Sequence, residues 1–206
     1  EPKDHKLLDA ILKDGEPNIP FMLSWANNPS SNDNSDILKT QSYGEQKDWE
    51  DHFDNLQLFF EHKNYIKIQG EPVFLIQRWD LITNFTGMFE CWKERAKSLN
   101  VPKVKLILLE GRSFTEKDRE AQKLIHGAVD RMWPTKRMPE HEMKKLITKH
   151  RIYWGSYTGL IDPVTHENKI TPQMFSNALQ TDFSMMSSIP GRKIESNLYF
   201  LNSWND

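Results

Sequence analysis

Short apolar segments alternate with amphipathic helical segments along the whole chain, and this alternation constrains the fold more than any other feature. The near-continuous apolarity of the short segments is typical of parallel strands covered on both faces. Such strands are predicted at 21–25, 73–77, 104–109, 128–130, 152–157 and 198–202. Helical periodicity predicts helices between them over 4–14, 48–63, 83–99, 113–125, 139–149 and 171–183. The repeated order of strand and helix predicts an α/β fold with a parallel sheet.

The number of predicted strands leaves two architectures open. A closed (β/α)8 barrel needs eight strands, and this sequence offers about six. The chain is therefore either an open α/β sheet or a barrel that lacks two βα units. Residues 65–76 are predicted as a short strand that turns at Gly70 into the next core strand. We expect residues 1–206 to form a single partial (β/α)8 domain.

Composition excludes several classes of protein. Apolar residues make up 37% of the 206 residues, and no apolar run approaches the roughly 18 residues of a membrane span. The net charge of -2 argues against a partner that is a nucleic acid. The one cysteine, Cys91, lies on a helical stripe and is predicted to pack, and the histidines lack metal-ligand spacing. We expect a cytoplasmic protein without a metal or cofactor, and the sequence does not specify the oligomeric state.

Polar and aromatic residues gather where the predicted strands end. Indole rings stack on the C–H faces of sugars, while amides and carboxylates hold hydroxyl groups in fixed directions. This composition predicts a saccharide-binding rim, with Glu110 as a candidate acid/base or, alternatively, a cap or ion-pair residue. Packing remains an alternative for the tryptophans at the strand ends. The residues predicted to bind substrate are Trp25, Asn27, Asn28, Arg78, Trp79, Tyr157, Asp162, Asn202 and Trp204.

An ordered series of motifs resembles the WbsX family. The series comprises Pro20-Phe-Met-Leu-Ser-Trp25-Ala-Asn27, Asp51-His-Phe53, the segment 65–76, and the runs 153–163, 171–179 and 198–206. This family comprises glycosyltransferases of polysaccharide biosynthesis clusters, also described as similar to glycoside hydrolase family 99. The resemblance implies a (β/α)8 barrel. It also implies that this chain is an internal fragment, without the first two βα units and the C-terminal end.

The resemblance also assigns catalytic residues. Asp206 falls on the first of two acids in the family's closing motif, one methylene shorter than the usual Glu, and the second acid would lie three residues further on. Asn28 stands where the family has a carboxylate, and an amide cannot serve as a base or nucleophile at neutral pH. The family's Asp-Asn-Thr-Pro-Arg run is reduced to Asp162-Pro163-Val-Thr165. These departures predict that the 206 residues by themselves are inactive.

Three functions follow from these expectations. The first is a glycosyltransferase of cell-surface, O-antigen-like polysaccharide assembly, with a saccharide or sugar-nucleotide substrate. Arg78, Arg112 and Arg131 at strand ends are then candidates for holding the diphosphate. The second is an endo-acting glycoside hydrolase similar to family 99, which would use the same residues. The third is a catalytically degenerate barrel that binds carbohydrate.

Overall fold

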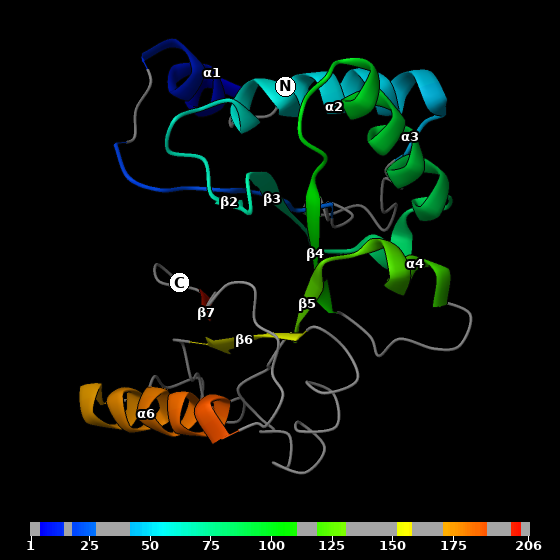
Figure 1. Ribbon diagram of the computed structural model, residues 1–206. Helices are drawn as coiled ribbons and strands as arrows, with labels where there is room; N and C mark the ends of the chain where they lie inside the picture. Colours follow the sequence, from blue (N-terminus) through cyan, green and yellow to red (C-terminus); the bar gives the residue numbers. More distant parts are fainter. Residues whose placement is uncertain are drawn as a thin grey trace, which may run out of the picture. The chain divides into compact units, whose positions relative to one another are not determined.

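Helices and strands alternate in the computed structural model in the order that the sequence pattern predicts (Figure 1). The structure describes residues 5–14, 18–27, 42–110, 119–130, 152–157, 171–188 and 199–202. The helix predicted over 139–149 lies outside these residues. The elements are α1 (His5–Asp14), β1 (Leu23–Trp25), α2 (Gln46–Phe60), β2 (Lys67–Ile68), β3 (Glu71–Ile76), η1 (Trp79–Leu81), α3 (Phe85–Ser98), β4 (Lys105–Glu110), α4 (Arg119–Leu124), β5 (Gly127–Asp130), β6 (Ile152–Tyr157), α6 (Pro172–Ser188) and β7 (Tyr199–Asn202).

The chain divides into two compact units. The first comprises Glu1–Leu108 and Arg112–His126, and the second comprises Leu109–Gly111 and Gly127–Asp206.

The first unit is built on the parallel strands β1, β3 and β4. Leu23 pairs with Phe74 and Trp25 with Ile76, and β3 continues the sheet with Phe74 opposite Leu106 and Ile76 opposite Leu108. Val73, Ile76, Leu106, Ile107 and Leu108 each keep at most 4% of their surface exposed, whichever face of the sheet they occupy. Burial on both faces is the reason that these strands read as continuous apolar runs rather than alternating ones.

A two-residue hairpin joins β2 to β3. The strands are antiparallel, with Ile68 opposite Glu71, and the turn residues Gln69 and Gly70 have φ angles of 55° and 80°. Positive φ at both central positions is the type I′ geometry that fits the twist of a tight hairpin. Gly70 accepts this conformation without steric cost. The predicted turn at Gly70 is confirmed.

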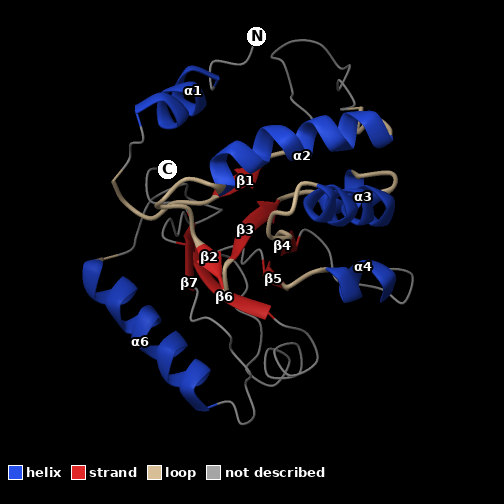
Figure 2. Ribbon diagram, turned by 45° about the horizontal axis from the view of Figure 1, so that its top comes forward, coloured by secondary structure: helices blue, strands red, loops and turns tan. Residues whose placement is uncertain are grey.

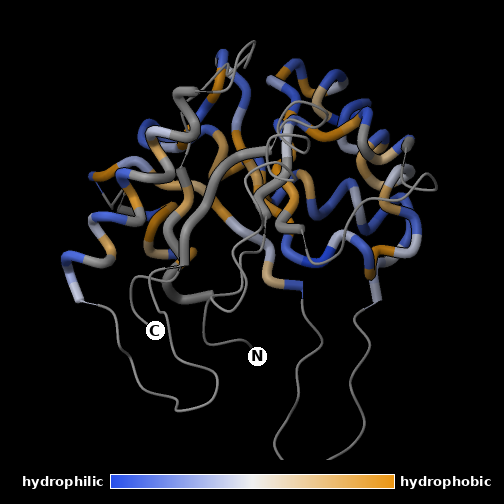
Figure 3. The backbone as a smooth tube through the Cα atoms, turned by 90° about the horizontal axis from the view of Figure 1, so that it is seen from below, coloured by the Kyte–Doolittle hydropathy of each residue, from blue (hydrophilic) through white to orange (hydrophobic). Residues whose placement is uncertain are grey.

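Helices α2 and α3 lie side by side against the sheet of the first unit (Figure 2). Both are amphipathic, and the coiled segments of the tube in Figure 3 alternate between hydrophilic and hydrophobic positions. Their buried faces meet β3 through aromatic contacts, in which the ring of Phe74 lies 6.2 Å from Phe60 and 5.9 Å from Trp92. The predicted stripes of these two helices therefore form the core.

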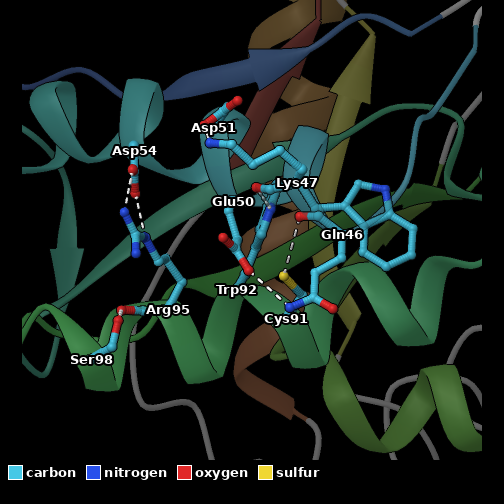
Figure 4. Close-up of polar contacts among 10 residues, drawn as sticks. Gln46, Lys47, Glu50, Asp51, Asp54, Cys91, Trp92, Arg95 and Ser98 are labelled. Atoms are coloured by element: carbon cyan, nitrogen blue, oxygen red, sulfur yellow. Dashed lines mark hydrogen bonds and ion pairs between the residues drawn. The ribbon is translucent and has the colours of Figure 1, made fainter.

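Polar contacts fix the ends of these helices and the seam between them. The Asp48 carboxylate accepts a hydrogen bond from the Glu45 N–H at the start of α2, and the Asn84 side chain accepts one from the Gly87 N–H at the start of α3. Across the seam, Arg95 donates two hydrogen bonds to Asp54 at 2.8 and 2.6 Å (Figure 4).

The second unit contains the parallel strands β5, β6 and β7. Val129 pairs with Tyr153, and Tyr157 pairs with Asn202 at the carboxyl ends of β6 and β7. The α/β class is therefore confirmed. Among the described strands, β1 pairs only with β3 and β7 only with β6, so the described pairings do not show a closed barrel.

Candidate functional site

The carboxyl ends of β1 and β3 bring four of the predicted site residues into one region of the first unit. The last ladder hydrogen bond runs from the Gln77 N–H to the Trp25 carbonyl oxygen at 3.1 Å. Beyond it, Asn27 lies two residues after the end of β1, and Arg78 lies two residues after the end of β3, as the N-cap of the short helix η1. Parallel register places these two residues together although 51 positions separate them in the sequence.

Beyond the last hydrogen bond between the strands, the Asn27 side chain binds the backbone of Arg78. Its Oδ1 accepts a hydrogen bond from the Arg78 N–H, and its Nδ2 donates one to the Arg78 carbonyl oxygen, both at 2.8 Å. A second Nδ2 contact reaches the Tyr43 hydroxyl oxygen at 3.2 Å. Asn27 is 1% exposed. The amide therefore holds the backbone of Arg78 in place, and little of its hydrogen-bonding capacity is left for a ligand.

Arg78 and Asp80 form a bidentate ion pair beside this clamp. The Arg78 Nε donates to Asp80 Oδ1 at 3.0 Å and Nη2 donates to Oδ2 at 2.9 Å. The two side chains keep 29% and 16% of their surfaces exposed. The hydrogen bond to Asp80 raises the pKa of Arg78 above its ordinary value, so the guanidinium stays charged. Sequence reasoning did not single out Asp80, although it lies only two residues after Arg78.

Trp25 lies on the side of the sheet that faces α2. Its ring contacts His52 of α2 edge to face at 4.7 Å and Tyr43 at 5.9 Å. His52 in turn lies 5.3 Å from Trp92, so an imidazole is enclosed between two indoles. Burial lowers the pKa of His52 from 6.5 to about 4, and the ring is therefore neutral at pH 7. Packing accounts for this placement of Trp25, and its contact with a ligand stays a prediction.

The other tryptophans of the first unit pack against their neighbours. Trp79 is 4% exposed and contacts Phe85 edge to face at 5.8 Å. Trp92 is 1% exposed and donates its indole N–H to the Trp49 carbonyl oxygen at 2.9 Å, so this ring lies in the core. The Trp49 indole donates to the Tyr43 carbonyl oxygen at 2.7 Å, which ties the segment before α2 to the helix.

Sequence reasoning missed Tyr43 and His52 as members of this region. His52 was visible only as part of the Asp51-His-Phe53 motif, and nothing local to Tyr43 predicts its approach to Asn27. Cys91, predicted to pack, lies at the α2–α3 seam with its sulfur 3.8 Å from the Gln46 carbonyl oxygen (Figure 4). Burial raises the pKa of this thiol, so its reactive thiolate form is disfavoured.

Of the remaining predicted site residues, Asn28 belongs to the first unit and the others belong to the second. Glu110 is the last residue of β4. Tyr157 and Asn202 are register partners at the ends of β6 and β7, so the structure does bring this predicted pair together. The positions of the other four lie outside the described residues, and their roles stay predictions: Asn28, Asp162, Trp204 and Asp206.

Within the part of the chain that the structure describes, no three side chains of His, Cys, Asp or Glu are grouped so that they could hold a metal ion. No helix within the same residues is long and apolar enough to cross a membrane.

Comparison with known proteins gives one match. No curated protein and no solved structure matches the chain. The family model described as glycosyltransferase WbsX matches residues 5–157, which is most of the chain and includes both Asn27 and the Arg78–Asp80 pair. The chain therefore belongs to the glycosyltransferase WbsX family.

Proposed function

We propose that this chain is a carbohydrate-active domain that transfers sugar residues in the assembly of a cell-surface polysaccharide. The observation that carries the proposal is the family match over residues 5–157. The strands β1 and β3 that bear Asn27 and Arg78 lie inside the matched range. A glycosyl-transfer site needs groups that orient hydroxyls and carboxylates that stabilise an oxocarbenium-like centre.

Separate roles are proposed for the predicted residues. Arg78, which is partly exposed, is a proposed binding group of the first unit. In the second unit, we assign substrate contacts to Tyr157 and Asn202 at the strand ends. Glu110 and Asp206 are the proposed acids, and Asn28, Asp162 and Trp204 complete the proposed saccharide site together with Trp25 and Trp79.

We also propose that residues 1–206 form a single partial (β/α)8 barrel domain. The parallel pairing of β1 with β3, of β3 with β4, of β5 with β6 and of β6 with β7 supports this architecture. So does the helix that follows each of several strands. Active sites in such barrels lie at the carboxyl ends of the strands.

Ligand binding tests the proposed function. We would titrate the protein with nucleoside-diphosphate sugars and with neutral oligosaccharides, and follow binding by calorimetry and product formation by mass spectrometry. Transfer of a sugar from a nucleotide donor is the expected result. Cleavage of an oligosaccharide without a nucleotide would replace the transferase with a family 99-like hydrolase. Saccharide binding without turnover would indicate a degenerate barrel, and no binding of either class would refute a carbohydrate function.

A further inference from the structure

The Arg78–Asp80 pair leaves one edge of a fixed guanidinium available. A guanidinium carries five N–H donors, and two of them bind Asp80. The other three, on Nη1 and Nη2, bind no further group among the described residues. The Arg78 side chain as a whole keeps 29% of its surface exposed. A ligand in solution can therefore reach this side chain.

Two contacts hold that edge in a fixed direction. The buried Asn27 amide binds both the N–H and the carbonyl oxygen of Arg78, which fixes the backbone. The Asp80 carboxylate binds Nε and Nη2, which fixes the far end of the side chain. The N–H groups at this edge of the guanidinium form a planar fork. A fork that is rigid before binding loses less conformational entropy when it forms hydrogen bonds with a ligand.

The charge of the pair decides which ligand suits this fork. Pyrophosphate is attracted by an uncompensated cation, but here the Asp80 carboxylate cancels the formal charge of Arg78 and would repel an incoming anion at short range. Neutral hydroxyl oxygens accept hydrogen bonds from the same donors without that repulsion. Two hydroxyls on adjacent sugar carbons match the spacing of two parallel N–H groups, as two carboxylate oxygens do.

We propose that the free edge of Arg78, oriented by Asp80 and Asn27, binds adjacent hydroxyl groups of a neutral saccharide and not the diphosphate of a sugar nucleotide. The inference rests on the proposed function and names the ligand chemistry of one part of the site. Asp80 and Asn27 are positioning residues in this arrangement.

The test follows the Arg78 side chain directly by NMR of its ¹⁵N–H groups, which are assigned from the signals lost in Arg78→Gln. Titration of the wild-type protein with a panel of neutral methyl hexosides should shift these signals, whereas inorganic pyrophosphate should not. Arg78→Gln should weaken saccharide binding about tenfold, the effect of losing two ordinary hydrogen bonds. Displacement of the saccharide by pyrophosphate in the wild-type protein would overturn the inference, and this arm needs no variant that might misfold.

Asp80→Asn gives a result of opposite sign for the two ligands. Removal of the carboxylate should weaken saccharide binding and at the same time raise the affinity for pyrophosphate, because the guanidinium charge is no longer compensated. If Asp80→Asn weakens both ligands or neither, the inference fails. Arg95–Asp54 is a matched control, since it is also bidentate and its side chains are 33% and 38% exposed. Arg95→Gln and Asp54→Asn should change neither affinity.

The two failures can be told apart. Saccharide binding that survives Arg78→Gln unchanged would overturn the inference and leave the proposed function standing. Absence of binding by any saccharide or sugar nucleotide would overturn both.

Discussion

Acidification should destabilise this protein through His52, between about pH 6.5 and pH 4. The imidazole is half-buried between the indoles of Trp25 and Trp92, and burial lowers its pKa from 6.5 to about 4. In the unfolded chain the ring protonates near pH 6.5, whereas in the native state it stays neutral until about pH 4. The unfolded state then binds more protons, so the contribution of His52 to stability is fully present above pH 6.5 and is lost as the pH falls.

The change in the pKa of His52 sets how much stability is lost on acidification. Lowering this pKa from 6.5 to about 4 corresponds to roughly 3 kcal/mol of unfolding free energy if burial acts in full. Because the ring retains some contact with solvent, we expect about 1–2 kcal/mol. Most of this change falls above pH 5, where exposed carboxylates are still ionised.

Urea unfolding at pH 7.5 and pH 5.0 measures the effect. Seven histidines are present in the chain, so the quantity of interest is the difference between the wild-type protein and His52→Gln. This variant should lose about 1–2 kcal/mol less on acidification. Asn55→Gln, an exposed substitution on the same helix, should behave as the wild-type protein does. The reasoning is refuted if His52→Gln and the wild-type protein show the same acid dependence, or if the His52 resonances titrate near pH 6.5.

Three further substitutions test the packing by the same urea assay. Tyr65→Phe removes a buried hydroxyl that accepts from the Leu23 N–H and donates to the Val73 carbonyl oxygen, so it should cost about 1–3 kcal/mol; a neutral result would mean that water replaces the bridge. Gly44→Ala forces a side chain onto a φ of +63° and against Asp48, and should cost at least about 1 kcal/mol; unchanged stability would show that this turn rearranges freely. Arg95→Ala breaks a partly exposed ion pair and should leave the urea midpoint nearly unchanged; a shift of the midpoint as large as that of Tyr65→Phe would contradict the view of this pair as a surface contact.

The elements were predictable because their periodicity is set by burial. The strand predicted over 152–157 coincides with β6, and the stripes of α2 and α3 are the faces that pack on β3. Element ends were less predictable. The second core strand was predicted to include Gln77, but β3 ends at Ile76. The Gln77 N–H still binds the Trp25 carbonyl oxygen of β1, but the N–H and the carbonyl oxygen of Arg78 bind the Asn27 side chain. No pattern within 73–77 contains that information.

The membership of the site was easier to predict than its internal contacts. Asn27 and Arg78 could be named because each follows an apolar run. That one side chain binds the backbone of the other depends on the register of β1 against β3, which pairs residues about 50 positions apart. Register also places Trp25 on the face of the sheet that packs against α2. The sequence shows that a tryptophan lies at the end of a strand, but it does not show on which face of the sheet the side chain lies.

The degree of burial therefore separates Asn27, which has a structural role, from Arg78, which is available to a ligand. Asn27 is enclosed, so an unpaired amide there would be costly, and the fold satisfies it with backbone partners from Arg78. Arg78 is reachable, so its remaining donors can stay with solvent until a ligand replaces the water. The same residue composition would bind a sugar differently if the register placed the amide outside and the guanidinium inside. A test of ligand binding should consequently begin at Arg78, and a test of how that side chain is aimed should begin at Asn27 and Asp80.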